Sequence, residues 1–211
     1  MNVIKNLLFD LGGVIMDIRR ENAVAALEDL GLSDANQLLG DYVQSGIFRS
    51  LEEGNISPEA FAHAVRNFLP DNGRGISDSQ INNAFMKFLV GIPVQRLRAL
   101  EQLHKSYKIF MLSNTNIIMW EGEIKEDFTV DGHDIDYYFD GIVTSFEAHS
   151  VKPDGGIFRY AIEKLGIKPE ETLFLDDSKL NTEAASRFGF ATLHVPTDTE
   201  FYDLLKCRLS L

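Results

Sequence analysis

Cysteine and long apolar runs are the two clearest shortages of this sequence. The single cysteine, Cys207, excludes an internal disulfide and favours a reducing compartment. Because it lies near the C-terminus, we expect it to pack passively. The N-terminal apolar run ends at Asp10, which makes it too short for a signal peptide or a membrane span. We therefore predict a cytoplasmic protein that does not contact membranes.

Basic residues are also few. The 20 lysines and arginines are outnumbered by 32 aspartates and glutamates, which gives a formal net charge of −12. This sign opposes binding to nucleic-acid backbones and anionic membranes, and no basic cluster overrides it. The composition, 45% hydrophobic and 25% charged, is that of an ordinary globular protein. An anionic ligand would therefore have to be held by a local cation or a metal.

The first apolar run ends in a carboxylate that is followed by glycines. Residues 3–9 are closed by Asp10, and Gly12 and Gly13 come next. Short apolar runs closed by turn residues indicate buried strands of a parallel sheet, where ligands bind beyond the carboxyl ends. Asp10 is thus predicted at the rim of a pocket, as a nucleophile or a metal ligand. One Asp-x-Gly by itself is better explained by an ordinary turn.

Further strand candidates alternate with predicted helices along the chain. They comprise residues 108–112, 141–144, 172–175 and 191–195. This alternation predicts an α/β protein with a Rossmann-like parallel sheet. Two of the candidates end in Ser113-Asn114 and Asp176-Asp177, so these residues should meet Asp10 at one edge of the sheet.

Residues 17–90 are predicted to form helices and turns, with no strand. Ser57-Pro58 begins one helix, and a capping box at residues 77–80 begins another. So long a block does not fit a simple crossover between parallel strands. We therefore predict a helical cap at 17–90, inserted into a core formed by 1–16 and 91–211. Residues 117–140, which include Trp120, receive no assignment.

Four short motifs stand in a fixed order in this chain. They are Asp10-x-Gly12, Ser113-Asn114, Lys152-Pro153 and Asp176-Asp177. This order resembles the four motifs of the haloacid dehalogenase (HAD) superfamily, and most of all the small bacterial branch related to alpha-glucose-1-phosphatase. The resemblance covers about residues 5–195. It implies a Rossmann-like core with an inserted helical cap, and a magnesium-dependent phosphatase of a small phosphorylated metabolite that works through an aspartyl-phosphate.

The resemblance also implies a metal site. Mg²⁺ prefers hard oxygen ligands, which Asp10, the backbone carbonyl of Gly12 and Asp176 would supply. Asp10 would in addition be the nucleophile. Asp177 would orient the water around the metal. The alternative for Asp176 and Asp177 is a helix N-terminus that favours acidic residues.

The remaining motifs would bind the phosphate. Lys152 would be the fixed cation beside phosphate and nucleophile. The Ser113 hydroxyl and the Asn114 N–H would hold phosphoryl oxygens. Alternatively, Ser113 and Asn114 could cap a helix, and Lys152 could be a solvated surface charge. Asn181 is expected to support the loop after the acids. The histidines lack metal-ligand spacing and are expected to be structural or exposed: His104, His133 and His149.

Gly12 departs from the pattern of many HAD phosphatases, which carry a second aspartate there as general acid and base. General acid catalysis is typically worth ~10²–10⁴-fold in rate. We therefore hypothesise a substrate whose leaving group needs less protonation, such as a sugar 1-phosphate. The same glycine argues against a phosphoglucomutase, which needs that acid in both half-reactions.

Two alternative functions remain open. A 2-haloacid dehalogenase uses the same nucleophile without a metal, but it has no use for two adjacent acids in a dry pocket, where like charges repel. A non-catalytic relative could instead bind a phosphorylated ligand. Cap residues are expected to set specificity, with Phe48, Arg49 and Phe61 as candidates to line the pocket. The sequence makes no prediction of the natural substrate or the oligomeric state.

Overall fold

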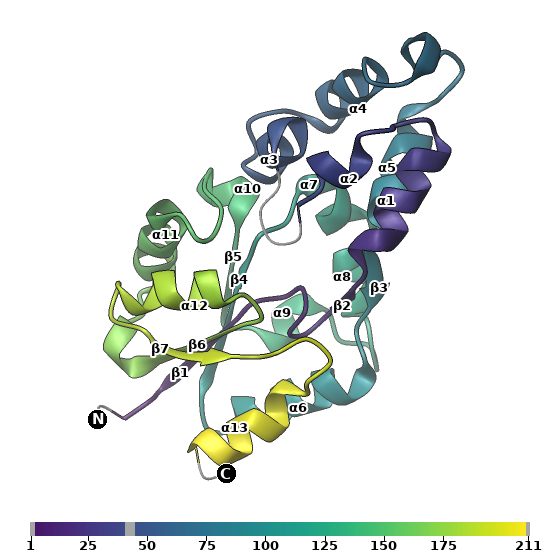
Figure 1. Cartoon of the computed structure of the whole chain (residues 1–211). Coiled ribbons are helices and arrows are strands. Elements are labelled where there is room, and N and C mark those ends of the chain that lie inside the picture. The colour runs from purple at the N-terminus through teal and green to yellow at the C-terminus, as the bar shows by residue number, and fades with distance from the viewer. Residues whose placement is uncertain (1–2, 41–44, 210–211) are drawn as a thin grey trace.

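A parallel sheet forms the centre of the protein. The computed structural model describes residues 3–40 and 45–209. Its five-stranded sheet has the order β5-β4-β1-β6-β7, and every neighbouring pair is parallel (Figure 1). The strands are β1 (Asn6–Phe9), β4 (Lys108–Ser113), β5 (Gly141–Thr144), β6 (Thr172–Asp176) and β7 (Ala191–His194). The predicted α/β class and all five predicted strands are therefore confirmed.

Both faces of the sheet are covered, which agrees with the apolar runs in β1, β4 and β6. Leu8 of β1 packs with Phe110 and Phe174 in one buried cluster, and Leu7 and Phe9 belong to another. Burying one such side chain contributes ~1.5–3 kcal/mol. Helices of the first cluster are α11 (Gly155–Leu165) and α12 (Lys179–Ser186), and helices of the second include α6 (Val94–His104) and α13 (Phe201–Leu209).

The register of the central strand brings the predicted site residues to one edge. Phe9 of β1 pairs with Met111 of β4 on one side and with Leu175 of β6 on the other. Asp10 and Asp176 therefore follow at the same level. Ser113 lies at the end of β4 beside them. The three strand ends thus form one edge of the sheet, as predicted.

Residues 17–91 begin and end in a short antiparallel ribbon that the sequence did not predict. It pairs β2 (Asp17–Ile18) with β3 (Leu89–Gly91). The prediction that this region has no strand is therefore wrong. The two strands were missed because they are only two and three residues long, which is too short to show periodicity. The predicted boundaries of core and cap fall at this ribbon, and the division remains a prediction.

Helices fill the region between β2 and β3. They are α1 (Arg20–Asp29), α2 (Ala35–Leu38), α3 (Gly46–Glu52), α4 (Pro58–Arg66) and α5 (Asp78–Met86), with a 3₁₀ segment at Pro70–Gly73. They lie together at one end of the molecule (Figure 1). Ser57 caps α4 by accepting from the Ala60 N–H at 3.2 Å, and Ser77 and Gln80 form the predicted capping box of α5.

Aromatic rings form the interior of this helical region. Phe48, Phe61 and Phe85 pack with ring centroids 5.0–5.5 Å apart. Phe48 and Phe61 have no exposed surface and are absent from the pocket lining described below. The prediction that they line the pocket is therefore wrong. An apolar face at helical spacing suits a buried core as well as a pocket wall.

The unassigned residues 117–140 are largely helical. They contain α7 (Ile117–Met119), a π-helical turn at Trp120–Ile124, α8 (Lys125–Asp127) and, after a turn, α9 (Ile135–Tyr138). Single π-turns within helices are rare and occur often at functional sites. Ile124, the last residue of this turn, and Met119, the residue just before it, both line the pocket described below.

The helices also bear on two other predictions. Cys207 on α13 is exposed, so the expectation that it packs passively is wrong. Among the residues that the structure describes, no helix combines the length and the apolar character needed to cross a bilayer.

Candidate active site

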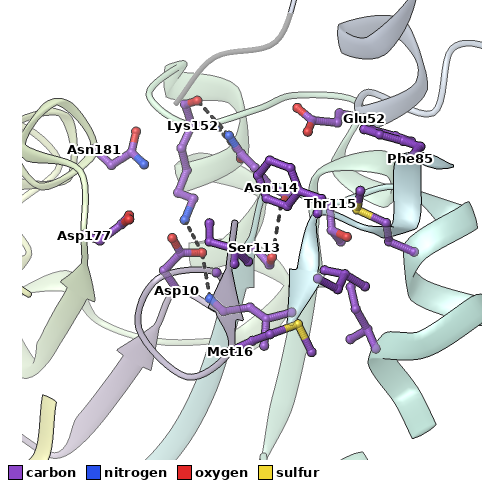
Figure 2. Close-up of a pocket in the computed structure, with 17 residues that line it drawn as sticks. Asp10, Met16, Glu52, Phe85, Ser113, Asn114, Thr115, Lys152, Asp177 and Asn181 are labelled. Atoms are coloured by element: carbon purple, nitrogen blue, oxygen red, sulfur yellow. Dashed lines mark hydrogen bonds and ion pairs between the residues drawn. The ribbon is translucent and has the colours of Figure 1, made fainter. Parts of the chain in front are cut away.

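Lys152 joins the ends of β1 and β6. Its Nζ lies 2.8 Å from Asp10 Oδ1 and 2.7 Å from Asp176 Oδ2. The lysine side chain is 1% exposed and that of Asp176 is fully buried, so these are ion pairs in a dry environment. Figure 2 shows the lysine pointing down to Asp10. The alternative of a solvated surface lysine is thereby excluded.

Backbone N–H groups and one amide fix the two carboxylates. Asp10 Oδ1 accepts from the Leu11 N–H at 2.7 Å. Asp176 Oδ1 accepts from the Ser178 N–H at 2.8 Å and from Asn181 Nδ2 at 3.0 Å. Asn181 therefore helps to fix the Asp176 carboxylate at the end of β6, in agreement with the expectation that it supports the loop after the acids.

The side chain of Asn114 fixes the lysine. Its Nδ2 donates to the Lys152 carbonyl at 3.0 Å, and its Oδ1 accepts from the Lys152 N–H at 2.8 Å (Figure 2). The sequence prediction used only the backbone N–H of Asn114, so this positioning role was missed. Ser113 and Asn114 line the same pocket as Asp10.

Three carboxylates cluster near the ammonium group of Lys152, and two of them, Asp10 and Asp176, pair with it. Ligand oxygens of Asp10, Asp176 and Asp177 all lie within 4.8 Å of one another. Burial raises the pKa of Asp10 well above its usual value; Lys152 opposes this, while Asp176 and Asp177 add to it. Burial also raises the pKa of Asp177 to about 6. Burial lowers the pKa of Lys152, but the carboxylates outweigh it and the net shift is upward.

This excess of negative charge fits a divalent cation. Carboxylate oxygens are the donors that Mg²⁺ prefers, and a cation would offset the repulsion among the three acids. The described acidic cluster could thus hold a metal ion. Gly12 lies in the pocket lining. That its backbone carbonyl binds the metal remains a prediction. Gly13 has φ +74°, and a Cβ there would collide with the Asp177 carboxylate, so a side chain at this position would displace an acid of the cluster.

The pocket above these residues has a polar floor and a mostly apolar wall. The floor contains Asp10, Ser113, Asn114, Lys152, Asp177 and Asn181. The wall includes Met16, Ile18, Phe85, Phe88, Met119 and Ile124. Two polar side chains also belong to the wall, Glu52 from α3 and Thr115 from the loop after β4. Neither was predicted from the sequence.

One signal in the sequence could have identified Glu52. Phe48, Leu51 and Glu52 follow the i, i+3, i+4 spacing of one helix face, and all three are buried. An acid on such a face calls for an explanation. Arg49, which was predicted to line the pocket, points elsewhere: it pairs with Glu53 at 2.8 Å and with Asp154 at 2.6 Å. It is absent from the lining, so that prediction is wrong.

The fold and the acids at its strand ends define a hydrolase of the HAD type. The family model of haloacid dehalogenase-like hydrolases matches residues 4–189, and the chain belongs to this family. The D-ribitol-5-phosphate phosphatase of Bacteroides thetaiotaomicron is 35% identical over 190 residues, which cover 90% of this chain and 91% of that protein.

A solved structure and a dehalogenase are also similar to this chain. A HAD family enzyme from B. thetaiotaomicron, crystallised with magnesium and inorganic phosphate, is 34% identical, with a TM-score of 0.87 and coverage of 95% of this chain and 98% of that one. The (S)-2-haloacid dehalogenase 4A of Burkholderia cepacia is 24% identical over 210 residues, covering 93% of this chain and 87% of that protein. The predicted HAD-like fold and the predicted class, a phosphoric monoester hydrolase, are confirmed.

Proposed function

We propose that this protein is a Mg²⁺-dependent phosphatase of a small phosphorylated polyol or sugar, with Asp10 as the nucleophile. One observation carries the proposal: the buried ammonium of Lys152 lies within 2.8 Å of Asp10 and 2.7 Å of Asp176 in the same pocket. A fixed positive charge beside the nucleophile would stabilise the negative charge of an incoming phosphoryl group, which supports the proposal. The similarity to a phosphatase of D-ribitol 5-phosphate supports the substrate class.

Asp10 would attack the phosphorus atom with one carboxylate oxygen. The bond from phosphorus to the leaving oxygen breaks, and that oxygen keeps the electron pair and takes a proton from water, because Gly12 has none to give. Water then attacks phosphorus and gives a proton to the hydroxide left by the first step; the bond to Asp10 breaks, and inorganic phosphate leaves while the carboxylate is restored. Both steps conserve atoms and charge and require no further reactant.

Other residues would stabilise the negative charge of the nucleophile and the phosphoryl group during these steps. Lys152 would offset the negative charge of nucleophile and phosphate, and the Ser113 hydroxyl and the Asn114 N–H would donate to phosphoryl oxygens. Mg²⁺ held by Asp10, the Gly12 carbonyl and Asp176 would supply neutralisation of the phosphoryl charge, with Asp177 orienting its water.

The relative's substrate bears on the leaving group. D-ribitol 5-phosphate is a phosphate ester of a primary alcohol, which supports an acyclic polyol phosphate rather than the sugar 1-phosphate predicted from Gly12. Comparing kcat/KM for D-ribitol 5-phosphate, glucose 1-phosphate and glucose 6-phosphate decides between them. A clear preference for either phosphate of a primary alcohol would reject the sugar 1-phosphate.

A screen of phosphorylated metabolites with Mg²⁺ tests the function itself. Wild-type protein should release phosphate, and the Asp10→Asn variant should release none while keeping its circular dichroism spectrum. Halide release from 2-haloacids without Mg²⁺ would instead support the dehalogenase alternative. Binding of phosphate esters without any turnover would support the non-catalytic alternative.

A further inference from the structure

Two polar side chains in the pocket wall have no hydrogen-bond partner among the residues that the structure describes. The Glu52 residue is 9% exposed and Thr115 is 4% exposed. The Thr115 hydroxyl oxygen is buried and has no hydrogen-bond partner in the described part of the chain. Glu52 likewise forms no hydrogen bond or ion pair with any residue that the structure describes. Both residues line the pocket, so they border the space that a ligand would occupy.

The backbone of Thr115 is held firmly. Its N–H donates to Ser145 Oγ at 3.0 Å, and its carbonyl accepts from the same hydroxyl at 2.8 Å. Ser145 itself is fully buried. The backbone that carries the Thr115 hydroxyl is thereby fixed, which lowers the entropy lost when this residue binds a ligand group.

Glu52 is suited to a neutral ligand group. Burial raises its pKa to about 8, against the opposing charges of Arg49 and Lys152 and with a contribution from Glu53. Arg49 is already paired with Glu53 and Asp154. At pH 7 the carboxyl group is therefore mostly protonated, so it both donates and accepts hydrogen bonds and does not repel a phosphate.

The position of the pair relative to the floor assigns it to one part of the substrate. Lys152, Ser113 and Asn114 occupy the floor, where the phosphoryl group would lie. Glu52 is too far from Lys152 to form an ion pair, and Figure 2 shows Glu52 and Thr115 on the side of the pocket away from Asp177 and Asn181. The carbon chain of the substrate would extend toward this side.

We propose that the Glu52 carboxyl and the Thr115 hydroxyl bind hydroxyl groups on the carbon chain of the substrate. The pocket would thereby select a polyhydroxylated phosphate ester over an ester of the same length without hydroxyls. This inference rests on the proposed function and adds the two residues that determine specificity. Sites built around a substrate hydroxyl discriminate strongly against the analogue that lacks it, because their own polar groups are then left unpaired.

The test compares two esters with five-carbon chains, D-ribitol 5-phosphate and pentyl phosphate. The ratio of their kcat/KM values is measured for wild type, Thr115→Val, Glu52→Leu and Glu52→Gln. We expect the ratio to fall at least about 10-fold in Thr115→Val and Glu52→Leu. It should stay within about threefold in Glu52→Gln, because the amide keeps a donor and an acceptor.

Thermal unfolding without substrate separates this role from a structural one. Thr115→Val and Glu52→Leu remove unpaired buried polar groups, so their Tm should equal or exceed that of wild type. Thr172→Val is the matched control, because the buried Thr172 hydroxyl, at the far end of β6, is paired with the Lys168 carbonyl at 2.7 Å. The Thr172→Val variant should be less stable than wild type, and its ratio of kcat/KM values for the two esters should be unchanged.

An unchanged ratio in both Thr115→Val and Glu52→Leu, with wild type active on the esters, would overturn this inference and leave the proposed function standing. Failure of wild type to hydrolyse either ester or any other phosphate in the screen would overturn the proposed function, and the inference with it. If Glu52→Leu does not fold, Thr115→Val alone decides.

Discussion

Asn114 and Lys152 exchange two hydrogen bonds, from the Asn114 amide to the lysine carbonyl at 3.0 Å and from the lysine N–H to the amide oxygen at 2.8 Å. These two hydrogen bonds fix the backbone of Lys152, whose side chain reaches Asp10 and Asp176. The position of the Lys152 ammonium group therefore depends on the side chain of Asn114, which follows the end of β4.

Replacing Asn114 with alanine removes both hydrogen bonds and keeps the backbone N–H. Misplacing a reacting group by about 1 Å can cost ~10²-fold in rate, so we expect kcat to fall by about that factor. Steady-state kinetics on the best substrate from the screen measures this. A fall of less than threefold would contradict the positioning role.

Removing the charge of Lys152 should destabilise the fold. Lys152→Met leaves Asp10 and Asp176 buried without their partner, and breaking a buried ion pair typically costs ~3–5 kcal/mol. Because a bound cation stabilises only the folded state, Mg²⁺ should restore part of this loss.

Urea unfolding with EDTA and with Mg²⁺ measures both effects. Lys5→Met is the matched control, since the Lys5 side chain is 61% exposed and pairs with Glu171 at the surface. Equal free energies of unfolding for Lys152→Met and wild type in EDTA would contradict the account of the site.

Glu52 should make stability depend on pH. Its pKa is about 8 in the folded protein against an ordinary value of 4.5, so between these values the folded state holds a proton that the unfolded state has lost. The free energy of unfolding should therefore fall as the pH rises from about 4.5 to about 8, by at most ~1.4 kcal/mol per pH unit for this proton, and then level off.

The difference between wild type and Glu52→Gln isolates this effect, because Asp10 and Asp177 contribute equally to both proteins. Urea titrations at pH 5, 6.5 and 8 should show wild type losing more stability than the variant as the pH rises. Parallel curves would show that Glu52 is ionised over this range and would refute the raised pKa.

The core and its acidic edge could be predicted because their signals are local. Apolar runs ended by Asp10, Ser113 and Asp176 indicate strands, and parallel strands bring their carboxyl ends to one edge. The ribbon of residues 17–18 and 89–91 could not be predicted, since so few residues show no period.

The wall of the pocket was predicted poorly for a different reason. Phe48 and Phe61 show the apolar spacing of a helix, but that spacing does not distinguish a side chain buried among helices from one that faces a cavity. Thr115 gave no signal, because its unpaired hydroxyl is a property of the packed structure. Only the orientation of α3 shows that Glu52 faces the pocket and Arg49 faces Asp154.

In the proposed reaction, Asp10 accepts the phosphoryl group and Mg²⁺ is required. Rapid quenching of turnover into borohydride reduces an aspartyl-phosphate to homoserine, and peptide mass spectrometry locates the reduced residue. We expect the modification at position 10 in wild type with substrate and Mg²⁺, and none in Asp10→Asn or with EDTA. Turnover that leaves residue 10 unmodified while another residue is reduced would contradict the account.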